Sequence, residues 1–125
     1  MVMMLLPDLQ LFKAEFFKAL AHPVRVRLLE VLRHGERSVQ ELQAALTVDQ
    51  STVSQHLAIL RARHVVTSRK EGTTVRYAVR DARVGALLDV SRAIFNAQLT
   101  GSQTMLRALR REGRRSPRRR ANRSA

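Results

Sequence analysis

Two short amphipathic segments joined by a very short turn constrain the fold of this chain more than any other feature. The first begins at Ser38, and Glu41 completes a capping box in which each side chain satisfies the other residue's backbone N–H. Asp49 is the expected N-cap of the second segment, Gln50 to Arg63, after a turn at Thr47-Val48. Two short helices joined by a turn of about three residues predict a helix-turn-helix.

Helical patterns also flank this pair. Asp8 is the expected N-cap of a helix that runs to about Leu20. A second helix covers Val24–Arg33, with Pro23 in its first turn and with Arg25, Arg27 and Glu30 facing outward, and Gly35 ends it. Near the end of the chain, Asp81 caps a long helix with an apolar stripe to Leu99. Gly101 weakens the pattern, but Met105, Leu106 and Leu109 suggest that the helix resumes or continues beyond it.

Between the helix pair and the last helix, the chain alternates apolar and polar residues. The segments Val65–Lys70 and Thr73–Arg80 flank Glu71-Gly72, which predicts a β-hairpin. The expected fold is therefore mainly α with one small β-hairpin. It is a winged helix-turn-helix with an additional helix at each end, and we expect these end helices to form a dimer interface.

The segment Gln50–Arg63 has an unusual outward face. At 100° per residue, Val53, Leu57 and Leu60 share one face and point toward the core. Short polar side chains and alanines occupy the other face, where exposed helices ordinarily carry Lys and Glu. Such a face fits the major groove of DNA, although packing on another subunit is the alternative. The candidate base-reading residues are Gln50, Ser51, Thr52, Ser54 and Gln55.

The predicted hairpin carries cations suited to a wing. With its loop at Glu71-Gly72, alternation directs Thr74 and Arg76 outward. The candidate phosphate contacts are Arg69, Lys70, Thr74 and Arg76. The alternative is that these charges merely discourage aggregation at an edge hairpin.

Three sequence blocks give the chain a family resemblance. Residues 17–29 (FKALAHPVRVRLL), residues 38–42 (SVQEL) and residues 50–57 (QSTVSQHL) resemble the ArsR/SmtB family of bacterial winged-helix repressors. The resemblance implies a homodimer that binds an imperfect palindrome in double-stranded DNA and releases it on sensing a metal or another signal. It also implies that Gln50, Ser51, Ser54 and Gln55 occupy base- and phosphate-contacting positions.

The metal sites of that family have no counterpart in this sequence. Ser38, Val39 and Gln40 occupy the positions of a Cys-Val-Cys pair, and the chain has no cysteine. The last helix contains Asp81 and Asp89 but no histidine. No two histidines have the i, i+4 spacing of a helical site, and His56 is expected to pack on the core side of its helix. We therefore expect no metal and no cofactor, and leave open an unidentified effector ligand or protein partner.

The first and last helices carry more apolar surface than one small core can absorb. This surplus predicts a homodimer held by both helices. The candidate interface residues are Leu9, Phe12, Phe16, Leu87, Leu88, Val90, Ile94 and Phe95.

The charge of the chain points to a polyanionic partner. The formal net charge is +13, and nine arginines between Arg107 and Ser124 face a single acid, Glu112. We expect a DNA-binding and dimerisation domain over residues 1–112 and a disordered arginine-rich tail over residues 113–125. The tail either binds phosphate or only keeps the protein soluble.

Other classes of protein fit the sequence less well. No long apolar run or signal peptide is found, so we expect a cytoplasmic, nucleoid-associated protein without a membrane partner. The sequence lacks a phosphate loop, paired carboxylates and an activated nucleophile, so we expect no enzyme. The alternative function is a sequence-indifferent nucleoid or RNA-binding protein driven by the basic tail, although stacking aromatics are scarce.

Overall fold

The computed structural model describes residues 2–113, with side chains from Asp8 onward. Residues up to Leu88 pack into one compact unit, and the remainder of the last helix, from Asp89, belongs to a second. The elements are α1 (Val2–Leu20), α2 (Pro23–Leu32), β1 (Arg37–Ser38), α3 (Val39–Leu46), α4 (Gln50–Ala62), β2 (Val66–Glu71), β3 (Thr74–Val79) and α5 (Arg83–Gly113).

The helix caps confirm the predicted helix-turn-helix. The Ser38 N–H donates to Glu41 Oε1 at 2.8 Å, and the Glu41 N–H donates to Ser38 Oγ at 3.2 Å. Thr47 ends α3 in the left-handed region, with φ 53°. The Thr52 N–H then donates to Asp49 Oδ1 at 2.7 Å, which starts α4. Local hydrogen bonds thus fix where both helices begin and turn.

The core of the first unit lies among α2, α3 and α4. Val53, Leu57 and Leu60 of α4 are completely buried, as their spacing predicts. They meet apolar residues of the two preceding helices and of the chain that leads into β2. The buried apolar set is Ala19, Leu28, Leu29, Leu32, Leu42, Leu46, Val53, Leu57, Leu60, Val65, Val66 and Val84.

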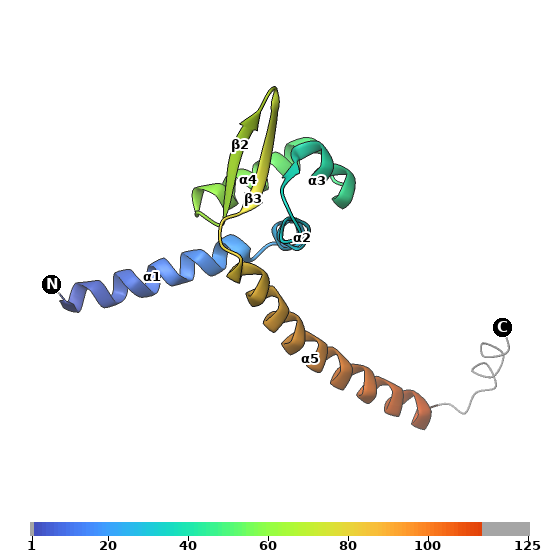
Figure 1. Ribbon diagram of the computed structural model, residues 1–125. Helices are drawn as coiled ribbons and strands as arrows, with labels where there is room; N and C mark the ends of the chain where they lie inside the picture. The colour runs from blue at the N-terminus through green and yellow to red at the C-terminus, as the bar shows by residue number, and fades with distance from the viewer. Residues whose placement is uncertain (1, 114–125) are drawn as a thin grey trace. The chain divides into compact units, whose positions relative to one another are not determined.

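The wing is part of a three-stranded antiparallel sheet with the order β1-β3-β2. Figure 1 shows the hairpin of β2 and β3 projecting from helices α2, α3 and α4. The sequence pattern missed β1, which pairs Arg37 with Tyr77 and Ser38 with Arg76, because two residues are too few to show alternation. The hairpin loop is Gly72-Thr73 rather than Glu71-Gly72, since Glu71 still pairs with Thr74. Gly72, with φ 65°, takes the first loop position, which is favourable for glycine.

One predicted helix boundary, the start of the first helix, is wrong, whereas the last helix continues past Gly101, as Met105, Leu106 and Leu109 suggest. The helix α1 begins at Val2, so Asp8 lies inside it and is not its N-cap. The methionines and leucines before Asp8 are strong helix formers, and their propensity outweighs the capping preference of Asp8. The helix α5 continues through Gly101 to Gly113, because one exposed glycine costs only about 1 kcal/mol in a long helix.

Two further predictions concern the arginine-rich tail and membrane-spanning helices. Apart from Gly113, which ends α5, the predicted arginine-rich tail lies outside the described residues. None of the described helices combines the length and the apolarity that crossing a bilayer requires.

Candidate nucleic-acid interface

The outward face of α4 presents most of the predicted base-reading residues together. Gln50, Ser51, Ser54 and Gln55 are exposed, whereas Thr52 is half-buried. The side-chain amide of Gln55 makes no hydrogen bond to any other residue that the structure describes, so both its donor and its acceptor are available. An amide in this state can form the bidentate pair that reads adenine in the major groove.

Asp49 orients the first turn of this face. Its carboxylate accepts a hydrogen bond from Ser51 Oγ at 3.1 Å in addition to the bond from the Thr52 N–H. Hydrogen bonds from the Thr52 side chain and backbone, and then from Ser51, lower the pKa of Asp49, which therefore stays ionised near neutral pH. Because the only hydroxyl proton of Ser51 points to Asp49, Ser51 presents lone pairs outward and is suited to accept from a base amino group or a backbone donor.

Arg25 of α2 holds α4 against the rest of the unit. Its Nε donates to the Ala19 carbonyl oxygen at 2.7 Å, and its Nη2 donates to the Lys18 carbonyl oxygen at 3.3 Å. Its Nη1 lies 3.0 Å from His56 Nδ1 on α4. One guanidinium therefore satisfies two carbonyls at the end of α1 and braces α4 at the same time.

The prediction that Arg25 merely faces outward is wrong, because its side chain is half-buried and bridges three helices. Arg27 is also engaged, since its Nη1 donates to the Leu46 carbonyl oxygen at the end of α3 at 3.3 Å. Helical periodicity places both residues off the core face. It cannot show that their long side chains reach back to a neighbouring helix.

Two histidines complete this support. His22 caps α2, because its Nδ1 accepts from the Val24 N–H at 3.1 Å. The rings of His22 and His56 lie 4.1 Å apart. Since an arginine cannot accept a hydrogen bond, His56 Nδ1 must be the unprotonated nitrogen that faces Arg25. Burial, followed by the neighbouring His22 and Arg25, lowers the pKa of His56.

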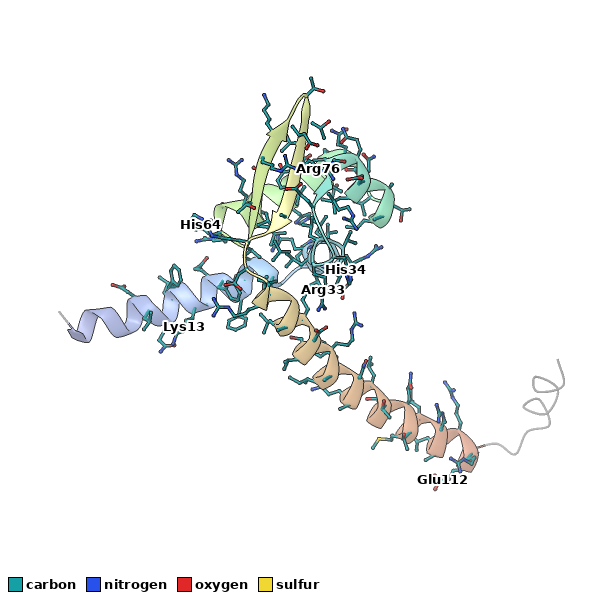
Figure 2. All side chains as sticks on the ribbon, in the orientation of Figure 1. Lys13, Arg33, His34, His64, Arg76 and Glu112 are labelled. Carbon is teal, nitrogen blue, oxygen red and sulfur yellow. The ribbon has the colours of Figure 1, made fainter. Side chains whose placement is uncertain are left out.

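The wing differs from the prediction in its charges. Lys70 is exposed and makes no ion pair with the described side chains, and Thr74 is half-buried. Arg76 does not extend freely outward, because it pairs with Glu36 at 3.3 Å and with Glu41 at 3.4 Å. Figure 2 shows Arg76 on β3, on the side toward α3. Arg69 pairs with Glu36 at 2.7 Å. The sequence pattern missed these pairs because it missed the strand β1, which Glu36 directly precedes and which pairs with β3.

The predicted dimer residues fall into two groups. Phe16 and Leu88 pack against the core of the first unit, and Leu87 is half-buried. The other predicted residues, five in number, expose about half of their surface or more, Phe12 the most at 73%. These exposed residues are Leu9 and Phe12 on α1 and Val90, Ile94 and Phe95 on α5.

No group of three or more potential metal ligands occurs among the residues that the structure describes. Ser38, at the position where the resemblance places a cysteine, is instead occupied in the cap of α3 and is buried.

A helix-turn-helix with a hairpin wing, and a second helix that exposes short polar side chains, defines the class of winged helix-turn-helix DNA-binding regulators. Comparison with known proteins agrees with this assignment. The family description "Bacterial regulatory protein, arsR family" matches residues 22–68. The HTH-type transcriptional regulator Rv0081 of Mycobacterium tuberculosis is 39% identical over 102 residues, which span 81% of this chain and 90% of that protein.

Solved structures give the same result over most of the chain. The crystal structure of Rv0081 superposes with a TM-score of 0.69, covering 75% of this chain and 95% of that one. The homodimeric winged helix-turn-helix DNA-binding domain Mb0332 of Mycobacterium bovis is 29% identical, with a TM-score of 0.68, and the match covers 74% of this chain and 86% of that one. The repressor BigR of Xylella fastidiosa is 32% identical, with a TM-score of 0.65, and the match covers 76% of this chain and 97% of that one. This chain belongs to the arsR family of bacterial regulatory proteins.

The lowered pKa of His56 predicts a loss of stability in mild acid. In the unfolded chain this imidazole takes up a proton near pH 6.5, whereas in the folded protein it does so only at a lower pH. The unfolded state therefore binds more protons between these values, and the free energy of unfolding should fall as the pH drops below about 6.5. Urea unfolding between pH 5 and 8 measures this slope.

The substitution His56→Gln should flatten this slope, and the same change at the exposed His34 is the matched control. If His56→Gln and His34→Gln altered the slope equally, the assigned neutral state of His56 would be wrong.

Proposed function

We propose that this protein is a homodimeric repressor that binds a palindromic operator in double-stranded DNA through α4 and its wing. The exposed face of α4 is the observation that carries this proposal. Gln50, Ser51, Ser54 and Gln55 lie together on a helix whose opposite face is completely buried. A repressor function is supported by relatives named as repressors, among them BigR and the HTH-type transcriptional repressor SmtB of Mycobacterium tuberculosis.

The roles within this surface follow from chemistry. Gln55 offers a donor and an acceptor to a base edge, and Ser51 and Ser54 are short enough to let the helix enter the groove. Lys70 approaches phosphate as a point charge, which strengthens binding without reading sequence. We assign α4 to sequence reading and the wing to backbone contact.

The homodimer is supported by apolar surface that the described part of the chain leaves uncovered. Ile94 and Phe95 are each more than half exposed on α5, as is Phe12 on α1. Large apolar side chains gathered on helix faces favour association with a second copy. The homodimeric state of the similar Mycobacterium bovis domain supports the same assembly here.

The basic tail supports a second candidate function, which is sequence-indifferent binding of nucleic acid. The short polar face of α4 favours the operator-binding function, because indifferent binding needs cations rather than a glutamine at that position. The protein acts by binding rather than by catalysis, and we assign it to the cytoplasm with the nucleoid. Release from DNA requires an unidentified ligand or protein that binds the free and DNA-bound conformations with different affinity, or else depends on protein concentration alone.

The assigned roles predict different outcomes for two substitutions. Gln55→Ala should weaken operator binding by about 1–3 kcal/mol and binding to scrambled duplex very little, because only the operator offers the matching base. Lys70→Ala should weaken both by the same factor. Fluorescence anisotropy titrations of both duplexes at one salt concentration measure these changes. Equal losses on both duplexes for Gln55→Ala would contradict base reading by this residue.

The dimer is tested by a charge placed in its apolar stripe. Phe95→Glu should convert the protein to a monomer at micromolar concentration, because the carboxylate would be buried against apolar side chains. Thr100→Glu is the matched control, since Thr100 lies on the opposite side of α5 by helical periodicity and is also exposed. Analytical ultracentrifugation distinguishes the two states. A monomeric wild type, or a Phe95→Glu variant that stays dimeric, would refute this interface.

A further inference from the structure

Charged side chains form a connected cluster on one face of the wing. Arg69 Nε and Nη2 donate to the two carboxylate oxygens of Glu36 at 2.8 and 2.7 Å, and Nη2 also donates to Glu71 at 3.2 Å. Arg76 Nε donates to Glu36 at 3.3 Å, and its Nη2 donates to Glu41 at 3.4 Å. This wing cluster therefore contains two guanidiniums and three carboxylates.

Glu36 is the member that both arginines share. Arg69 and Arg76 are direct partners across strands β2 and β3, so their like charges would repel each other if nothing lay between them. Glu36 accepts hydrogen bonds from both arginines and offsets their mutual repulsion. Hydrogen bonds from Arg69 lower the pKa of Glu36 more than any other contact, so this carboxylate stays ionised near neutral pH.

The wing cluster remains accessible to solvent. The side chain of Arg69 is 52% exposed and that of Glu36 is 31% exposed. Two oxygens of a phosphate group offer a guanidinium the same bidentate geometry as the two oxygens of a carboxylate. Glu36 and a DNA phosphate are therefore alternative bidentate partners for the edge of Arg69 that Nε and Nη2 form, and this edge can hold only one of them at a time.

We propose that Glu36 is a specificity-determining residue of the DNA-binding surface, because it holds Arg69 and Arg76 in ion pairs that withhold them from phosphate. Since phosphate contacts are indifferent to sequence, each arginine withheld lowers binding to random DNA and leaves discrimination to α4. This inference rests on the proposed function. Under it, Arg69 and Arg76 contact DNA phosphate only when Glu36 releases them, whereas Lys70 can contact phosphate at any time.

The substitution Glu36→Gln tests the proposal, because it keeps the shape of the side chain and removes its charge. Affinity for scrambled duplex should rise several-fold. The slope of log K against log salt concentration should become steeper by about 1 for each guanidinium released. The ratio of operator affinity to scrambled affinity should fall. Glu30→Gln on α2 is the matched control, since it removes the same charge away from the wing cluster.

A second pair of variants separates masking from damage to the wing. Arg69→Gln alone should change binding to scrambled duplex less than Lys70→Ala does, because Arg69 is already paired. Arg69→Gln combined with Glu36→Gln should reverse the part of the gain in affinity for scrambled duplex that the released Arg69 supplies. Circular dichroism verifies that each variant is folded. A folded Glu36→Gln variant with unchanged or weaker binding to scrambled duplex, or with the same slope as Glu30→Gln, would overturn the proposal.

Elution from heparin, a polyanion without base sequence, keeps this test distinct from the proposed function. Glu36→Gln should elute at a higher salt concentration than Glu30→Gln even if the wild type does not discriminate between duplexes. If the wild type does not discriminate between operator and scrambled duplex but Glu36→Gln still elutes later from heparin, the operator-binding function is rejected and the masking of the arginines is retained. Discrimination without the shift would retain the function and reject the masking.

Discussion

The burial of one face of α4 is the constraint on which the rest of the surface depends. Val53, Leu57 and Leu60 are fully enclosed by α2, α3 and the start of β2, so α4 cannot rotate without exposing them. That packing fixes Gln55 and its polar neighbours on the outside. Arg25 strengthens the arrangement by joining the end of α1 to His56. Site and core are therefore two faces of the same helix.

The wing is connected to the helix-turn-helix by the backbone and by charged side chains. Its sheet begins in β1, whose last residue, Ser38, is also the first residue of the capping box of α3. Glu41 contributes both to this cap and to a contact with Arg76. The position of the wing is thereby linked to the helix-turn-helix through side chains as well as through the chain. The ion pairs of Glu36 with Arg69 and Arg76 reduce, in our proposal, indiscriminate attraction to phosphate in a protein whose formal net charge is +13.

The sequence predicts the parts of this structure that depend on local interactions. Ser38 with Glu41, and Asp49 with Thr52, bond within one helical turn, and the inward stripe of α4 follows from its period. The partners of Arg25, Arg69 and Arg76 are different, because they lie on elements distant in sequence. Periodicity gives only the side of a helix or strand from which such a side chain leaves the backbone, and not where its charged end lies. It therefore placed Arg25 and Arg76 outward and gave no protein partner for Arg69, whereas the folded chain engages all three.

Footprinting on the DNA that this protein binds tests the central claim most directly. Duplex recovered by genome-wide capture should show two protected major-groove patches related by two-fold symmetry. Their centres should lie about 34–36 Å apart, one helical turn, because a symmetric dimer places one α4 in each half-site. A single patch, or protection spread evenly along every fragment, would contradict an operator-binding dimer and would favour a protein that coats nucleic acid without reading it.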